Sequence, residues 1–116
     1  MKGALWSWLL VLAGCGTSPV QQCREGVGTT CEKVFECYTT DTERAAIKPI
    51  YGKDVPACVA QLSATLKCDT ADKDACPAGL VYHGDQAAAC VRETKALKCE
   101  QLKAGMTPAS CTMICK

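Results

Sequence analysis

Residues 54–68 read DVPACVAQLSATLKC and carry the clearest helical pattern of the chain. The first residue is an aspartate, a typical N-cap, and a proline two positions later is tolerated in a first helical turn. Cys58, Leu62 and Leu66 follow at steps of four, which places them on one face of a helix. The pattern predicts an amphipathic helix over about 55–67 whose apolar face packs inward.

Other helix signals lie before this segment. Capping boxes are possible at Thr29 with Glu32 and at Thr40 with Glu43, each ahead of a short helix. Pro49 is expected to end the second of these helices early, because it has no backbone N–H.

The C-terminal half carries a second set of signals. Residues 69–84 are looser, with turn chemistry at 76–79, and Asp85 is expected to cap a helix that runs to about Lys98. Gly105 suits the end of a further helical turn, and a last helix is expected to open at Thr107-Pro108. The residues expected to face inward on the helix from 85 are Ala87, Cys90, Val91, Thr94 and Leu97.

No segment alternates between apolar and polar residues with period two, the pattern of a half-buried strand. The sequence therefore predicts an all-α fold, a small disulfide-stapled helical bundle of about four to five short helices.

The start of the chain has a different composition. A single lysine at position 2 precedes an apolar run over 4–13, and residues 12–15 read LAGC. The run is shorter than the roughly 20 residues that span a bilayer. This pattern resembles the leader and lipobox of bacterial lipoproteins. The resemblance implies a signal peptide at 1–14, acyl chains such as palmitate on Cys15, and a lipidated tether at 15–22. The alternative is an ordinary secreted protein that is cut near Ala13 or Gly14 and keeps Cys15 as a thiol or disulfide partner.

The resemblance also implies a location. Two or more acyl chains give stable membrane anchoring, whereas one gives only marginal binding. In this family an aspartate after the lipidated cysteine favours the inner membrane, and Gly16 stands there instead. We expect a protein of the bacterial cell envelope, anchored through lipid on Cys15, with the outer membrane favoured over the inner one.

Cysteine parity agrees with this interpretation. The chain has 11 cysteines, and assigning Cys15 to lipid leaves an even number for a disulfide-rich helical domain at 23–116. Exported domains use such bonds when few large side chains are available to bury. The predicted disulfide cysteines are Cys23, Cys31, Cys37, Cys58, Cys68, Cys76, Cys90, Cys99, Cys111 and Cys115.

Helix geometry limits the pairing. Ten helical steps separate Cys58 from Cys68 by roughly 15 Å, beyond the limit of about 7 Å between bonded cysteines. The same argument separates Cys90 from Cys99, and Cys31 from Cys37. If the helices around 58–68 and 90–99 are antiparallel neighbours, as we favour, two bonds join them. The antiparallel pairs are Cys58 with Cys99 and Cys68 with Cys90, and the parallel alternatives are Cys58 with Cys90 and Cys68 with Cys99.

The sequence offers little that points to chemistry. His83 is the only histidine and is expected in an exposed turn, while Ser63 and Ser110 lack the Gly-x-Ser-x-Gly elbow of hydrolases. There is no Cys-x-x-Cys pair, and residues 69–74 lack the glycine and glutamate of a calcium loop. We expect no catalytic residue, no metal and no cofactor.

Charge likewise singles out no ligand. The leader holds one of the 13 basic residues and none of the 12 acidic ones, so charges balance beyond it, and no basic tract suggests nucleic acid. The leading hypothesis is therefore a non-catalytic envelope lipoprotein with a structural or protein-interaction role. The alternative is a small rigid inhibitor or binder of an extracellular enzyme, with 69–84 as its contact loop; a hydrolase that uses His83 is a third hypothesis.

Overall fold

The computed structural model describes residues 18–116, so the predicted leader and Cys15 lie outside the described residues. The described chain is helical and confirms the all-α class. Its elements are α2 (Pro19–Cys37), α3 (Asp41–Tyr51), α4 (Val55–Thr65), η1 (Cys68–Thr70), α5 (Ala71–Asp74), α6 (Gly84–Ala96), α7 (Cys99–Lys103) and η2 (Ala109–Thr112).

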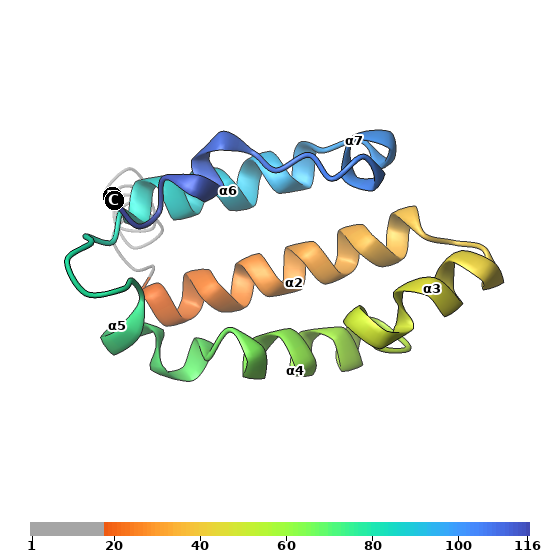
Figure 1. The fold of residues 1–116 in the computed structure, drawn as a ribbon, viewed down its shortest axis with the longest axis horizontal. Helices are drawn as coiled ribbons and strands as arrows, with labels where there is room; N and C mark the ends of the chain where they lie inside the picture. The colour runs from red at the N-terminus through yellow and green to blue at the C-terminus, as the bar shows by residue number, and fades with distance from the viewer. Residues whose placement is uncertain (1–17) are drawn as a thin grey trace, which may run out of the picture.

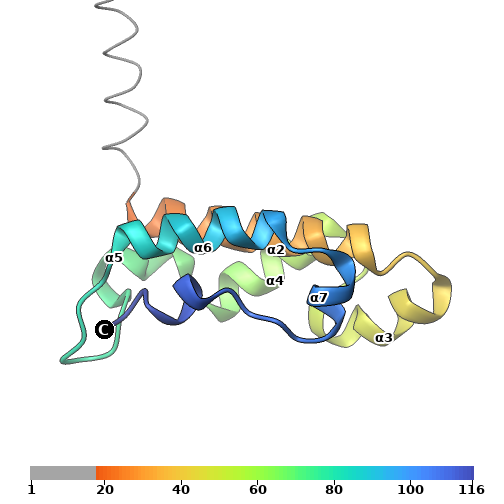
Figure 2. The ribbon, with the colours of Figure 1, turned by 90° about the horizontal axis from the view of Figure 1, so that it is seen from above.

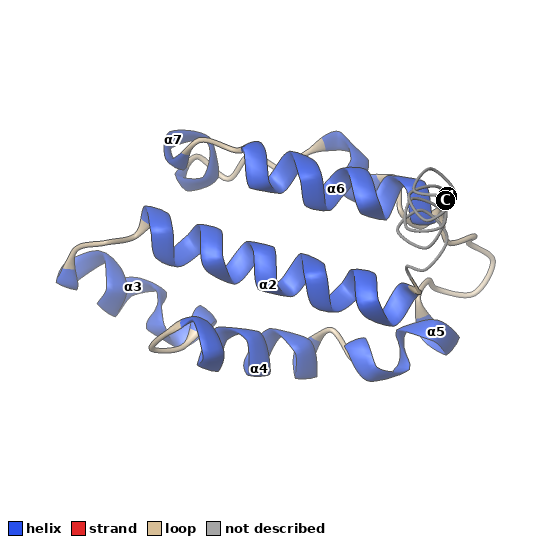
Figure 3. Ribbon diagram, turned by 180° about the vertical axis from the view of Figure 1, so that it is seen from behind, coloured by secondary structure: helices blue, strands red, loops and turns tan. Residues whose placement is uncertain are grey.

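Helix α2 lies in the middle of the bundle, with α4 along one side and α6 along the other (Figure 1). The chain runs along α4 in the direction opposite to α2, and along α6 in the same direction. The segment after α7, which contains η2, returns beside α6 (Figure 2). Seen from behind, the same three rows of helix are clear (Figure 3). Helix α2 therefore separates α4 from α6.

Helix α2 begins earlier than the sequence patterns predicted. The Ser18 hydroxyl accepts a hydrogen bond from the Gln21 backbone N–H, and the Gln21 Oε1 atom accepts one from the Ser18 N–H, which forms a complete capping box at the start of α2. The predicted start at Thr29 is wrong, because that residue is buried inside the helix. The predicted tether over 15–22 is also too long at its C-terminal end, since positions 19–22 form the first turn of α2.

Helix α3 confirms one signal and corrects another. The capping box of Thr40 and Glu43 is present at its start. Pro49 does not end the helix, which continues to Tyr51. The missing N–H removes one backbone hydrogen bond near the end, and the helix closes where Gly52, with φ of 81°, donates to the Lys48 carbonyl at 2.9 Å.

Helix α4 confirms its cap and corrects its inward face. Asp54 accepts a hydrogen bond from the Ala57 N–H at 2.9 Å, as expected for an N-cap. Leu66, predicted to face inward, is 60% exposed. Leu66 is the C-cap of the helix and its N–H still bonds to the Leu62 carbonyl, so it keeps helical geometry but lies at the helix end, outside the buried core cluster.

The C-terminal helices differ in detail from the predictions. The N-cap position of α6 is His83, and Asp85 lies in the first turn, where its charge complements the helix dipole. The helix ends at Ala96, and α7 then ends before Gly105, whose φ is 80°. The last helix, expected after Thr107-Pro108, is a single 3-10 turn.

The hydrophobic core lies on the α4 side of α2. Of the described residues, α6 contributes none to this cluster. Its buried members come from α2, α3, α4 and η1, and they are Val27, Cys31, Val34, Phe35, Ile47, Cys58 and Cys68.

Five disulfides join the ten cysteines of the described chain, but not in the predicted pairs. They are Cys23–Cys68, Cys31–Cys58, Cys37–Cys99, Cys76–Cys115 and Cys90–Cys111. No bond links two cysteines of one of these helical segments, as geometry required. Both predicted arrangements between the 58–68 and 90–99 segments are wrong, because α2 lies between these segments and its own cysteines bond to three of theirs.

Candidate functional site

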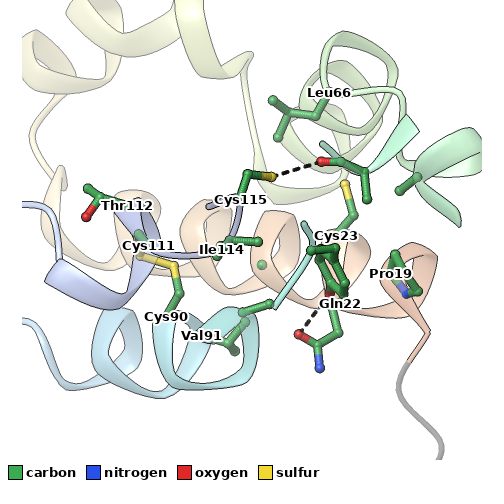
Figure 4. Close-up of a pocket in the computed structure, with 15 residues that line it drawn as sticks. Pro19, Gln22, Cys23, Leu66, Cys90, Val91, Cys111, Thr112, Ile114 and Cys115 are labelled. Carbon is green, nitrogen blue, oxygen red and sulfur yellow. Dashed lines mark hydrogen bonds between the residues drawn. A yellow bond between two sulfur atoms is a disulfide. The ribbon is translucent and has the colours of Figure 1, made fainter. Parts of the chain in front are cut away.

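A pocket of about 430 Å³ opens between the N-terminal half of α2, helix α6 and the segment after α7 (Figure 4). This segment, residues 104–116, is called the C-terminal segment. Its walls combine residues from several elements that are distant in sequence. They are Pro19, Gln22, Cys23, Gly26, Leu66, Ala71, Ala75, Tyr82, Ala87, Cys90, Val91, Cys111, Thr112, Ile114 and Cys115.

Small side chains create this space. Gly26 of α2 faces α6, and a Cβ atom built on it would lie 3.9 Å from the Val91 Cγ2 atom. Ala87, buried on α6, also lines the pocket. The two helices therefore approach closely at positions that provide little side-chain volume, and a space remains beside their contact.

The C-terminal segment forms another wall. It pairs with the chain just before α6 in a short antiparallel arrangement, in which the His83 N–H donates to the Ile114 carbonyl at 2.7 Å. Val81 and Lys116 exchange two further backbone hydrogen bonds. The Cys76–Cys115 and Cys90–Cys111 bonds fix the same segment to the loop and to α6.

The lining is mostly apolar, and none of its described side chains is charged. Its main polar contact is the Tyr82 hydroxyl, which donates to the Gln22 Oε1 atom at 3.4 Å, and Gln22 is itself buried (Figure 4). Burial raises the pKa of Tyr82 above its usual 10, so its phenol is neutral at ordinary pH. The pocket therefore suits an uncharged, apolar occupant.

The residues weighed for hydrolase chemistry have other contacts. His83 is half-buried rather than exposed, at the start of α6. Ser110 is buried, and its hydroxyl donates to the Glu93 carboxylate at 2.8 Å. Ser63 lies on α4, on the other side of α2 from His83.

The acidic stretch at 69–74 forms the end of η1 and the short α5. Asp69 makes an ion pair with Arg24 of α2. Within residues 18–116, no group of three or more histidine, cysteine or acidic side chains is arranged to hold a metal ion.

The sequence patterns did not reveal the pocket. Its walls are assembled by the disulfides of the C-terminal segment and by α6 packing on α2, which are tertiary features. Gly26 lies inside a helix, but so does Gly28, which does not line the pocket, so an interior glycine alone did not indicate it.

No protein-family model matches this chain, and comparison with curated proteins and with solved structures found no similar protein.

Proposed function

We propose that this chain is a lipid-anchored protein of the bacterial cell envelope with a structural or protein-interaction role and no catalysis. Residues 1–14 act as the signal peptide, and Cys15 carries the acyl chains. The outer membrane is favoured over the inner one because Gly16 follows the lipidated cysteine.

The observation that supports this proposal best is the disulfide framework. The ten cysteines of residues 18–116 pair with one another. No cysteine of this part of the chain is left to bond Cys15, which suits a separate role for Cys15. Also in this part of the chain, no helix has the length and apolar character needed to cross a membrane.

The start of α2 defines how far the domain sits from its anchor. Ser18 caps the helix, and three steps of chain separate it from Cys15. At about 3.3 to 3.6 Å per residue they span at most roughly 11 Å. The proposed anchor therefore holds the domain against the membrane surface.

Intact-mass analysis of the native protein tests this proposal. We expect a chain that begins at Cys15, carries acyl mass and has no titratable thiol before reduction. The variant Cys15→Ser should leave the membrane fraction and still contain its disulfides, whereas the neighbouring control Thr17→Ser should stay membrane-bound. A native protein without acyl mass, or a Cys15→Ser protein that remains membrane-bound, would contradict the anchor.

A second candidate function, an inhibitor or binder of an extracellular enzyme, is favoured by one surface feature. Leu80 and Val81 are 46% and 63% exposed in the loop before α6. The Cys76–Cys115 bond and the pairing of Val81 with Lys116 hold this loop in place. A preorganised apolar loop suits binding, because little flexibility is lost on contact.

Substitution on this loop tests the second function. The double variant Leu80→Ser with Val81→Ser should lose crosslinking to an envelope or extracellular enzyme at unchanged thermal stability. The exposed Met106, elsewhere on the surface, provides the control Met106→Ser. If both proteins crosslink to the same partners as the parent chain, the loop is not a binding surface.

A further inference from the structure

We infer that the pocket beside α2 is an acyl-binding site that takes one of the fatty acyl chains carried on the chain's own Cys15. This inference rests on the proposed lipidation and goes beyond it. It assigns a ligand chemistry and a source to a cavity of the folded domain.

The first argument is position. Pro19, in the first turn of α2, lines the pocket and is labelled at its edge in Figure 4. Four chain steps separate it from Cys15, which corresponds to at most about 14 Å of extended backbone. An acyl chain on Cys15 is therefore attached within reach of the pocket wall.

The second argument is chemistry. No described side chain of the lining is charged, and the polar pair Gln22 and Tyr82 is already hydrogen-bonded. A volume of about 430 Å³ lies in the range of small-molecule pockets, roughly 300 to 1,000 Å³. A hydrocarbon chain fits such a lining without leaving a buried polar group unpaired.

The third argument is an exposed apolar residue at the pocket. Leu66 lines it and yet is 60% exposed. An acyl chain lying in the pocket would cover part of this side chain, removing apolar surface from water.

The tethered source is favoured over a free lipid by effective concentration. A ligand joined to its site by a short flexible linker is present there at about millimolar concentration. A free fatty acid must compete with that value. The chain on Cys15 therefore fills the pocket first.

The binding capacity of the pocket is tested with the full-length, unlipidated Cys15→Ser protein and a fluorescent fatty acid, dansyl-undecanoic acid. We expect saturable binding of one probe per chain. Adding Gly26→Leu places a side chain in the pocket and should weaken binding at least tenfold. Gly28→Leu is the matched control, because a Cβ atom on Gly28 of the same helix meets nothing within 4 Å and this residue does not line the pocket.

A second variant tests the same site with a substitution at an exposed position, so its result does not depend on how the protein tolerates a larger residue at Gly26. Leu66→Glu puts a charge on the pocket wall at an exposed position, so folding should be unaffected and probe binding should again fall at least tenfold. Ile50→Glu, at another exposed apolar position, should bind as the parent does. No saturable binding to Cys15→Ser, or equal binding by all variants, would overturn the acyl-binding site.

The source of the chain is tested in cells by feeding a photoactivatable fatty acid. Illumination of the lipidated protein should crosslink the acyl chain on Cys15 to pocket peptides that contain Val91 or Ile114. The substitution Gly26→Leu should abolish this crosslink, and Gly28→Leu should retain it. Crosslinks from Cys15 only to bilayer lipids, together with probe binding by Cys15→Ser, would mean that the pocket takes a free lipid, and the inference fails. A Cys15 without any acyl group is a different result, which removes the proposed anchor and its tethered chain together.

Discussion

The two faces of α2 differ in their disulfides. On the face that meets α4, disulfides join α2 directly to the neighbouring elements. On the other face, no disulfide within the described chain joins α2 to α6. Cys31 bonds to Cys58 on the first face, and Cys90 of α6 bonds instead to Cys111 of the C-terminal segment. The buried core follows the same division, since its cluster lies on the α4 side. The buried core cluster therefore lies on one face of α2, and the apolar pocket opens beside the other.

The α6 side is held by helix packing and by one disulfide of α2 that lies beyond the end of α6. Cys37 at the end of α2 bonds to Cys99 at the start of α7. The contacts between α2 and α6 include the Lys33 ammonium, which donates to the Lys95 carbonyl near the end of α6 at 3.0 Å, and the approach of Gly26 to Val91. Small side chains let the helices meet there without filling the space beside them.

The largest expected contrast comes from removing one disulfide on each side. Replacing both Cys31 and Cys58 by alanine, or both Cys90 and Cys111, opens loops of 27 and 21 residues, and each change should cost about 3 to 4 kcal/mol by loop entropy. The first pair should cost at least about 1 kcal/mol more, because Cys31 and Cys58 are fully buried and leave a void.

Denaturant unfolding of the two double variants measures this difference. The four remaining disulfides of each protein are verified by mass before the measurement. A larger loss of unfolding free energy for the Cys90 and Cys111 variant would contradict the expectation that burial in the core adds to the cost of removing Cys31 and Cys58.

A matched pair of valines sharpens the comparison. Val34 is 2% exposed in the core cluster, while Val91 is only partly buried and lines the pocket. We expect Val34→Ala to cost about 2 kcal/mol, because it removes packed methyl groups, and Val91→Ala to cost less than about 1 kcal/mol, because an empty space already adjoins it. Thermal unfolding checks both values, and equal losses would contradict the division of the two faces.

The sequence predicted those features of this fold that depend on neighbouring residues. Thr40, Asp54 and Gly105 were assigned correctly because a capping side chain or a positive φ acts within one turn. The all-α class and the exclusion of bonds within a helical segment follow equally from local geometry.

The features that were missed depend on tertiary placement. The disulfide pairs could not be deduced, because they require knowing that α2 separates α4 from α6. Leu66 fits the apolar periodicity of α4 and keeps helical geometry, and its exposure depends on what packs beside the end of the helix. The pocket exists because Gly26 meets α6 and the C-terminal segment closes over the same space. Neither contact can be predicted from neighbouring residues in the sequence.

A third prediction concerns the C-terminal end of α2, where Arg44 of α3 contacts it on the side of the buried core cluster. Arg44 donates hydrogen bonds to the carbonyls of Phe35, at 2.8 Å, and Tyr38, and its guanidinium lies 4.6 Å from the centre of the Phe35 ring. These carbonyls belong to the helix end, where no further helical N–H is available. Arg44→Met should therefore cost about 1 to 2 kcal/mol.

The control is the other arginine that bridges two elements of this side. Arg24 pairs with Asp69, but both side chains are more than half exposed, so Arg24→Met should cost less than about 1 kcal/mol. The denaturant midpoints of the two variants show whether the loss of stability comes from losing any positive charge or from losing the specific hydrogen bonds of Arg44. Equal shifts would contradict the capping role of Arg44.

The smallest expected effect concerns the ion pair between α3 and α7, which helps to hold the α6 side to the core side. Lys103 donates to the Glu43 carboxylate at 2.6 Å, and this bond, together with the Thr40 N–H, lowers the pKa of Glu43 from 4.5 to about 2. A lowered pKa in the folded state means that the carboxylate stabilises the fold above about pH 4.5 and that this contribution is lost as pH falls toward 2. The effect is small because both side chains remain partly exposed to solvent.

The substitution Glu43→Gln isolates this charge. Glutamine can still accept the Thr40 N–H bond of the capping box, so the cap is kept while the ion pair is lost. We expect the melting temperature of the parent to exceed that of Glu43→Gln at pH 6 and the two curves to converge as pH falls toward 2, with the difference at pH 6 reduced by added salt. Lys103→Met should reproduce the pH 6 difference if the ion pair is its cause. A difference that stays constant from pH 6 to pH 2 would show instead that the charge of Glu43 does not cause it.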